Sequence, residues 1–173
     1  MTNDGLKIRR FEERDAPAVR SLFIRVNRLL APPGMEDAFE RYIERSIEAE
    51  IGRIGPYYAE RDGLFFVAEQ DGHLAGMFGL ERAGQVVLEL RRMYVAPECR
   101  GMGYGRELLA AAEAEARRLG AVRLILSTSE VQQAALGVYR SSGYAEVAET
   151  AEADGSNKVL GGGLRRFHFE KRL

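Results

Sequence analysis

The hydrophobic pattern near the start of the chain predicts a short strand followed by a helix. Residues 6–11 alternate in the manner of a strand. Asp15 then stands where a helix N-cap is expected, and Pro17 falls in the first turn. Apolar side chains follow at helical spacing, at Val19, Leu22, Phe23 and Val26.

A second helix is predicted after a break in this pattern. The stretch Ala-Pro-Pro-Gly at residues 31–34 ends the first helix. Residues 36–53 then place charged side chains on one helical face. The opposite face carries apolar side chains, at Phe39, Ile43, Ile47 and Ile51. Gly55 and Pro56 are expected to end this helix.

From residue 64 the period of the pattern changes from that of a helix to that of a strand. Residues 64–82 predict two strands joined at Asp71-Gly72, which is a strong signal for a hairpin. Residues 85–95 predict a third strand, which ends near Pro97. Three consecutive strands are therefore expected in the middle of the chain.

Helices and strands alternate in the remaining sequence. A helix is predicted over residues 104–119, with Gly120 at its C′ position. Its buried stripe is expected at Leu108, Ala112, Ala116 and Leu119. A strand over residues 122–127 follows. The next helix is marked by Val131, Ala134, Ala135 and Val138.

The last helix is expected to end near Gly143, and two strands close the chain. These strands are predicted at residues 144–150 and 164–173, joined by a polar, glycine-rich stretch at 153–163 that predicts a mobile loop. The order is β-α-α-β-β-β-α-β-α-β-β, without internal repeat or linker. It indicates a single α+β domain over residues 1–173, built on one central sheet.

The composition fits such a domain and excludes several functional classes. Apolar residues make up 46% of the 173 residues, which suffices for a core. The 25 basic and 26 acidic residues balance, which argues against nucleic-acid or membrane-surface binding. Cys99 is the only cysteine, so neither an intrachain disulfide nor a cysteine-rich metal site is expected. Neither a signal peptide nor a membrane-spanning run is found, so a cytoplasmic location is expected.

A glycine-rich segment between a strand and a helix is the main chemical signal. Residues 100–109, RGMGYGRELL, place three glycines at alternate positions. Helix N-termini carry unpaired N–H groups, and glycine lets a ligand approach the backbone, so the segment predicts a phosphate-binding site. The dinucleotide fingerprint requires G-x-G-x-x-G and the Walker loop requires Gly-Lys-Ser/Thr, and neither spacing is present.

The spacing R-x-x-G-x-G, at Arg100, Gly103 and Gly105, resembles the pyrophosphate loop of the GNAT superfamily of N-acetyltransferases. The stretches RRMYVAPECRGMGYGRELL and VYRSSGY resemble that family's central strand, loop and helix, and its next helix and turn. The resemblance covers most of the chain and is tightest over residues 86–147. It implies an α/β/α sandwich with a mostly antiparallel sheet of about seven strands, splayed between strands 4 and 5, and about four helices.

Within that superfamily the chain is similar to the camello-like, or N-acetyltransferase 8-like, branch. The stretches YYAERDGLFFVAE, STSEVQQAALGVYRSSGY and FHFEKRL carry this likeness. Animal members of the branch have a membrane-spanning stretch after the first helix, where this chain has the charged helix 36–53. Their membrane placement and substrates are therefore not expected here.

The resemblance implies acetyl-CoA as cosubstrate, bound where two parallel strands separate. The first of these strands is expected to carry a bulge, and the backbone of Met93, Tyr94 and Val95 to pair with the pantetheine arm. Gln132, where many relatives have asparagine, is expected to contact the cofactor's amide groups. The pyrophosphate is expected on backbone N–H groups of the loop, at Arg100, Gly101, Met102, Gly103, Tyr104, Gly105 and Arg106.

Two residues are candidates for catalysis by the same resemblance. Tyr139 matches a position at which many members place a general acid, and a phenol can protonate the departing CoA thiolate. The alternative is a tyrosine that only packs on the sheet. Glu89 matches the general base of histone-type members, because an amine must lose a proton before it attacks a thioester. The alternatives are a solvated Glu89 or an ion pair with Arg91, and Glu81 is a weaker candidate base.

Strand alternation places Glu89, Arg91 and Met93 on one face. Arg91 is expected to form a structural ion pair rather than to hold a substrate carboxylate. His73 and His168 are far apart in the predicted fold, so no catalytic metal is expected.

Together these residues predict transfer of acetyl from acetyl-CoA to a primary amine by direct attack, with Tyr139 as acid and Glu89, directly or through water, as base. The acceptor is left open among a small amine, an amino-acid conjugate and a peptide. The walls of the acceptor site are expected from the Pro-Pro-Gly segment 32–34, the helix 36–53 and the loop 151–163. The alternatives are a protein N-terminal acetyltransferase and a non-catalytic CoA-binding sensor or scaffold. Neither nucleic acid nor membrane is an expected partner, and a homodimer is left open.

Overall fold

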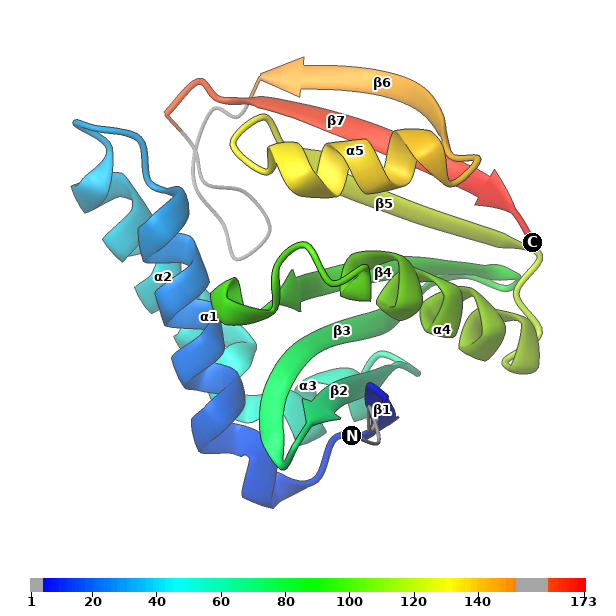
Figure 1. Ribbon diagram of the computed structural model, residues 1–173. Helices are drawn as coiled ribbons and strands as arrows, with labels where there is room; N and C mark the ends of the chain where they lie inside the picture. The colour runs from blue at the N-terminus through cyan, green and yellow to red at the C-terminus, as the bar shows by residue number, and fades with distance from the viewer. Residues whose placement is uncertain (1–4, 152–161) are drawn as a thin grey trace.

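The computed structural model describes residues 5–151 and 162–173, which form one seven-stranded sheet with helices on both faces (Figure 1). The strands are β1 (Lys7–Arg10), β2 (Leu64–Gln70), β3 (His73–Gly84), β4 (Val87–Val95), β5 (Arg123–Ser129), β6 (Ala145–Ala151) and β7 (Arg165–Arg172). The helices are α1 (Ala16–Leu30), α2 (Glu36–Ala49), α3 (Ile54–Ala59), α4 (Tyr104–Arg118) and α5 (Gln133–Ser141).

The strand order is β1-β2-β3-β4-β5-β7-β6. All neighbouring strands pair antiparallel except β4 and β5, which are parallel and are joined through α4. The α+β class, the layering and the seven strands are confirmed, and α1, α2, α4 and α5 are the four longer helices expected.

The end of the second helix differs from the prediction. The sequence predicts a helix over residues 36–53 that Gly55 and Pro56 end. Instead, α2 ends at Ala49, and α3 begins at Ile54 after a 3-10 turn. Gly55 and Pro56 lie in the first turn of α3, where a proline removes no hydrogen bond because the first N–H groups have no intrahelical acceptor.

The sheet separates two hydrophobic clusters. Along β2, Phe65 and Val67 pack toward α1, α2 and α3, whereas Phe66 and Ala68 pack toward α4 and α5. Leu108, Ala112 and Ala116 of α4 are fully buried, as the predicted stripe requires, and Leu119 is partly buried.

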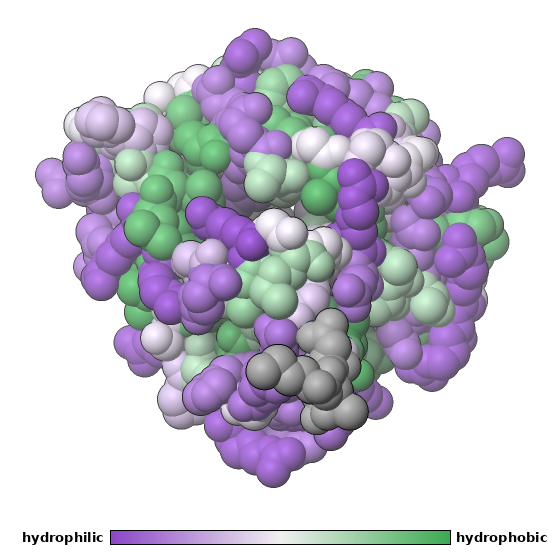
Figure 2. All heavy atoms as spheres, in the orientation of Figure 1, coloured by the Kyte–Doolittle hydropathy of each residue, from purple (hydrophilic) through white to green (hydrophobic). Residues whose placement is uncertain are grey.

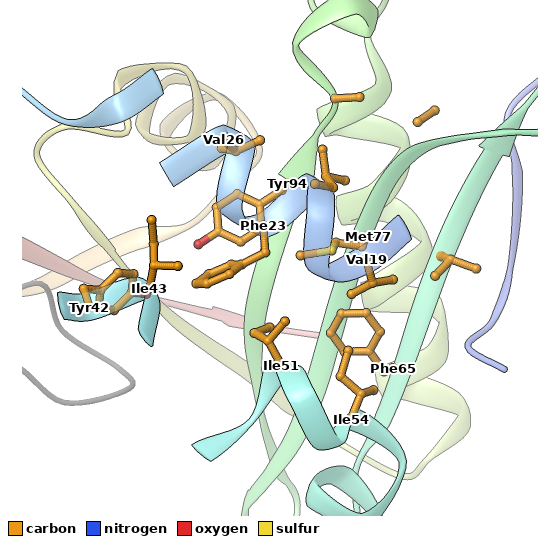
Figure 3. Packing of buried hydrophobic residues seen from close by; sticks show 14 of the residues in the cluster. Val19, Phe23, Val26, Tyr42, Ile43, Ile51, Ile54, Phe65, Met77 and Tyr94 are labelled. Carbon is orange, nitrogen blue, oxygen red and sulfur yellow. The ribbon is translucent and has the colours of Figure 1, made fainter. Parts of the chain in front are cut away.

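The first cluster joins α1, α2 and β4 through aromatic rings. Phe23 of α1 packs against Tyr94 of β4 at 5.9 Å between ring centroids, and against Tyr42 of α2 at 6.1 Å. Figure 3 shows Phe23 between these two elements, with Ile43 of α2 beside it. This packing fixes α2 against the end of β4.

β4 and β5 pair over only part of their length. Their ladder joins Val87–Leu90 to Arg123–Leu126. Beyond it, β4 continues to Val95 and β5 to Ser129, and Figure 1 shows the two strands diverging toward the side where α2 lies. The predicted splay between strands 4 and 5 is confirmed.

Two further expectations concern the predicted loop before the last strand and the presence of a membrane-spanning helix. The predicted loop 153–163 lies outside the described residues, apart from Gly162 and Gly163. A Cβ atom at Gly162 would lie 2.9 Å from Met35 Cε, so Gly162, which precedes β7, lies beside the break between α1 and α2. Within residues 5–151 and 162–173, no helix is both long enough and apolar enough to cross a membrane.

Gly79 of β3 tests the packing of α3 against the sheet. A Cβ atom there would lie 2.3 Å from Tyr58 Oη, and Tyr58 is buried. Because the ring has no free space, we expect Gly79→Ala to lower the free energy of unfolding by about 1–3 kcal/mol, measured by urea denaturation. Gly84→Ala in the same strand meets only ordinary contacts at 3.6 Å and should change it by less than about 0.5 kcal/mol. Equal stability of the two variants would contradict this packing.

Candidate functional site

Two cavities lie where β4 and β5 separate. The larger, of about 480 Å³, is lined by α1, the end of β4, the glycine-rich loop and α5. The smaller, of about 70 Å³, is lined by residues of α2, β4, β5, α5 and β7. Met93, Tyr94 and Gln132 line both, so the cavities meet at the separated end of β4.

The surface differs between the middle and the rim of the face that carries α4 and α5. In Figure 2, drawn in the orientation of Figure 1, hydrophobic and weakly polar side chains lie in the middle and toward the left of the view, and strongly hydrophilic side chains are most frequent around the rim. The walls of the larger cavity are partly apolar, because Val26, Leu30, Val131 and Val138 contribute to them. Such a wall suits a long, partly apolar ligand.

The glycine-rich loop leads directly into α4. Gly101 and Gly103 have φ of +79° and +82°, in the left-handed region that glycine adopts without a Cβ clash. Gly103 is the N-cap of α4, and within the described residues its position offers no side chain to cap the helix. The first N–H groups of α4 therefore have neither an intrahelical acceptor nor a side-chain cap, and an anion can bind there.

All the predicted cofactor residues except Met102 line the larger cavity. They are Met93, Tyr94, Val95, Arg100, Gly101, Gly103, Tyr104, Gly105, Arg106 and Gln132. Met102 is not among the lining residues, and 48% of its surface is exposed. Gln132 is the N-cap of α5, and its Oε1 accepts a hydrogen bond from Thr128. The binding roles of these residues stay predictions.

β4 carries the expected bulge, at Arg92. Its register with β3 shifts between Gly79 and Met77, where β4 has one extra residue. Arg92 has φ of +54°, a left-handed conformation that costs a residue other than glycine about 1–2 kcal/mol.

The bulge changes which side chains share a face. Strand alternation predicts Glu89, Arg91 and Met93 on one face. Instead, Met93 packs against the cluster under α4 and α5, and Tyr94 packs into the cluster under α1, α2 and α3. The prediction for Met93 was wrong because the extra residue inverts the alternation beyond Arg92.

The two arginines at the bulge bind one buried carboxylate. Glu50, just after α2, has no exposed surface, and its Oε2 lies 2.6 Å from Arg91 Nη2 and 2.8 Å from Arg92 Nη2. Tyr58 donates a 2.6 Å hydrogen bond to Glu50 Oε1, and Tyr42 Oη accepts one of 2.6 Å from Arg92 Nη1. The structural ion pair predicted for Arg91 is confirmed, with Glu50 as its partner.

The arginines keep Glu50 ionised. Burial by itself would raise the pKa of Glu50, but the charge and hydrogen bonds of Arg92, the charge of Arg91 and the hydrogen bond from Tyr58 outweigh it and lower the pKa to about 2. Burial and the Glu50 charge raise the pKa of Tyr58 well above its ordinary value. At neutral pH, Tyr58 therefore stays a donor and Glu50 an acceptor.

Tyr139 of α5 lines the smaller cavity. The centroid of its ring also lies 5.9 Å from the ring centroids of Tyr144 and Phe169. Tyr139 therefore takes part in core packing and also borders the cavity. Burial, with a smaller contribution from Tyr94, raises the pKa of the Tyr139 hydroxyl above its ordinary value. The phenol is therefore protonated at neutral pH and can donate.

Glu89 lines the smaller cavity as well, and it is half-buried. Glu81 stands opposite it on β3, accepts a 3.0 Å hydrogen bond from Tyr57 and lies 3.4 Å from Arg91 Nε. Of the two candidate bases, Glu89 rather than Glu81 is placed on the cavity wall.

Sequence reasoning missed Glu50, Arg92 and Arg166. The buried stripe of α2 runs through Phe39, Tyr42, Ile43 and Ser46 at helical spacing, and Glu50 continues it four residues later. A charge on an apolar stripe was the available signal. Arg166 of β7 lines the smaller cavity and donates a 3.1 Å hydrogen bond to Ser127 of β5. That placement depends on the pairing of β5 with β7, which no local pattern indicates.

The sequence also matches a known family across this site. The Acetyltransferase (GNAT) family matches residues 26–144, from α1 through the glycine-rich loop to the end of α5 and the turn after it. The chain belongs to this family.

Individual GNAT relatives agree with that assignment. N-acetyltransferase family 8 member 2 of Rattus norvegicus is 26% identical over 137 residues, which are 76% of this chain and 59% of that protein. An IAA acetyltransferase of Azospirillum brasilense is 36% identical over 90 residues, 51% of this chain and 58% of that protein. The chain thus spans about three fifths of the length of these relatives. The likeness to the N-acetyltransferase 8-like branch is confirmed.

A solved N-acetyltransferase structure shows the same fold. PaiA N-acetyltransferase from Thermoplasma acidophilum, in complex with coenzyme A, superposes with a TM-score of 0.78 over 98% of this chain and 99% of that one. The identity is 22%, so this likeness concerns the fold.

The charge of Glu50 makes stability depend on pH in the acid range. Its folded pKa of about 2 lies below the ordinary 4.5, so its stabilisation is complete above pH 4.5 and lost as pH falls toward 2. We expect the stability difference between wild type and Glu50→Gln, measured by urea denaturation, to shrink by about 2–3 kcal/mol over that interval. Glu60→Gln, which removes an exposed carboxylate from its ion pair with Arg53, is the control and should show far less change. A difference that does not vary with pH would contradict an ionised Glu50.

Proposed function

We propose that this chain is an acetyl-CoA-dependent N-acetyltransferase that acetylates a primary amine. The observation that carries the proposal is the meeting of two cavities at the separated end of β4, one walled by the glycine-rich loop and the other by Tyr139 and Glu89. Membership of the GNAT family supports acetyl-CoA as the donor.

Acetyl-CoA would occupy the larger cavity through backbone contacts. The β4–β5 ladder stops at Leu90, so residues 93–95 present an edge that β5 does not pair with, and the pantetheine amides can bind along it like an added strand. The pyrophosphate would bind the loop 100–106, where α4 begins and its N–H groups and positive end face an anion. The thioester would then lie near Met93 and Tyr94, where the cavities meet.

The amine would approach from the smaller cavity. Glu89, directly or through a water molecule, takes a proton from the ammonium, and the free amine attacks the thioester carbonyl. Backbone N–H groups of residues 93–95 would stabilise the oxyanion of the tetrahedral intermediate. The C–S bond breaks as Tyr139 gives its proton to the thiolate, and the amine nitrogen passes its second proton through water to the Tyr139 phenolate. The products are an N-acetyl amine and CoA.

The smaller cavity also bounds the acceptor. Its volume of about 70 Å³ and its polar wall, with Glu89, Ser127 and Arg166, suit a small amine or the amino end of a longer molecule. The direct test is release of free CoA thiol from acetyl-CoA with a panel of small amines, amino-acid conjugates and peptides. Release with one acceptor class supports the proposal, and binding of acetyl-CoA without release from any of them favours a CoA-binding scaffold instead.

A substitution at Gly103 tests whether the loop 100–106 binds acetyl-CoA. Alanine at φ of +82° is strained, and the loop must hold this conformation to present its N–H groups. We expect Gly103→Ala to weaken acetyl-CoA binding, measured by calorimetry, about 5-fold or more. Gly120→Ala is the matched control, because Gly120 has φ of +80° at the far end of α4 and also has open space around its Cβ position. Both variants should lose stability, and equal loss of affinity would contradict the loop assignment.

A substitution at Tyr139 tests whether this residue is the general acid. We expect Tyr139→Phe to keep acetyl-CoA affinity and to lower kcat about 10²–10⁴-fold, because the thiolate loses its proton donor. Tyr144→Phe is the control, since the hydroxyl of Tyr144 binds Glu113 instead and its ring packs beside Tyr139. Steady-state kinetics with the best acceptor of the panel makes the comparison, and unchanged turnover in Tyr139→Phe would remove the acid role.

A further inference from the structure

Glu50 is fully buried and ionised beside the site, yet it is not among the residues that line either cavity. Its partners Arg91 and Arg92 line the smaller one. We propose that Glu50 is a positioning residue for acetyl transfer: it holds the bulge of β4 in the form that opens the site. The catalytic part of this inference rests on the proposed function.

The geometry of a strand supplies the first step. Successive side chains of a regular strand point to opposite faces, so Arg91 and Arg92 could not both reach one carboxylate from regular β4. They do so because Arg92 has φ of +54°. Both ion pairs to Glu50 Oε2, at 2.6 and 2.8 Å, therefore exist only with the bulge, and they stabilise it against the regular strand.

The second step follows from where the bulge lies. The β4–β5 ladder ends at Leu90, one residue before Arg91. The extra residue sends Met93 and Tyr94 to faces opposite to those that regular alternation would give them, and both line the two cavities. A β4 without its bulge would therefore place both side chains on the opposite faces of the sheet and change the walls of both cavities.

Further contacts connect Arg91 and Arg92 to the smaller cavity, where the acceptor is proposed to bind. Tyr42 of α2 lines the smaller cavity and binds Arg92 Nη1 at 2.6 Å. Arg91 Nη1 is buried without a hydrogen-bond partner in the described part of the chain, so Arg91 depends on Glu50 and on Glu81, 3.4 Å from its Nε. Removal of the Glu50 charge alone would leave this arginine pair undercompensated.

The test separates positioning from simple stabilisation with three variants. Glu50→Gln keeps the shape of the side chain and removes its charge. Glu50→Gln with Arg92→Met also removes one arginine, so that Arg91 and Glu81 remain as a balanced pair. Glu50→Gln with Arg92→Gly removes the same charges but places at position 92 a residue that adopts φ of +54° without strain. Glu60→Gln, in an exposed ion pair, is the control.

We expect Glu50→Gln to lower kcat about 10–100-fold at saturating acetyl-CoA, with circular dichroism showing a folded protein, because small misplacements of reacting groups have effects of this size. The double variant with Arg92→Met should have a higher denaturation midpoint than Glu50→Gln alone, but no higher kcat. The double variant with Arg92→Gly should have a kcat about 5-fold above that of the Arg92→Met double variant, because glycine lets the bulge form more readily. Should Glu50→Gln alone fail to fold, the two charge-balanced double variants still provide the comparison.

Two kinetic results would overturn the proposal. One is wild-type kcat in Glu50→Gln with only a lower denaturation midpoint, and the other is equal kcat in the Met and Gly double variants. If the wild-type protein transfers no acetyl group to any acceptor, the proposed function is wrong, but the role of Glu50 in holding the bulge can still be tested. The amide NMR shifts of residues 91–95 in the ligand-free proteins then decide: shifts that change in Glu50→Gln and return in the Gly variant support the role of Glu50, and unchanged shifts overturn it.

Discussion

The site depends on one buried carboxylate that binds two consecutive arginines of the same strand. Glu50 accepts hydrogen bonds from Arg91 and Arg92, and this is possible only because β4 bulges at Arg92. The bulge lies directly after the last residue that pairs with β5. One local irregularity thus coincides with the end of the ladder, the change of side-chain faces and the meeting point of two cavities.

The two cavities present different chemistry to a ligand. The larger one offers backbone: a strand edge at residues 93–95 that β5 does not pair with, and the start of α4, where Gly101, Gly103 and Gly105 lie. The smaller one offers side chains, among them Glu89, Tyr139 and Arg166. Backbone groups are the same whatever the sequence, so the first cavity suits a cofactor common to a whole family. If the proposed function is right, the side-chain wall of the smaller cavity is where different members would select different acceptors.

Much of the fold was predictable because its signals are local. The Asp71-Gly72 turn, the buried stripe of α4 and the spacing of Gly101, Gly103 and Gly105 each depend on a few adjacent residues, and the structure contains the corresponding hairpin, helix and left-handed loop. The misplaced end of α2 is also instructive. Gly55 and Pro56 end a helix in most contexts, but proline fits a first turn equally well, and the sequence does not say which turn it occupies.

By itself the sequence determined the α+β class, the order of the elements, the glycine-rich segment that leads into α4 and the family. These follow from periodicity and from short motifs whose effect is confined to neighbouring residues. Only the tertiary structure decided that Met93 leaves the face of Glu89 and Arg91, and that Glu50 is the partner of both arginines. The physical reason is that a bulge is stabilised by contacts across the sheet and with α2, so its position depends on a residue more than forty positions away.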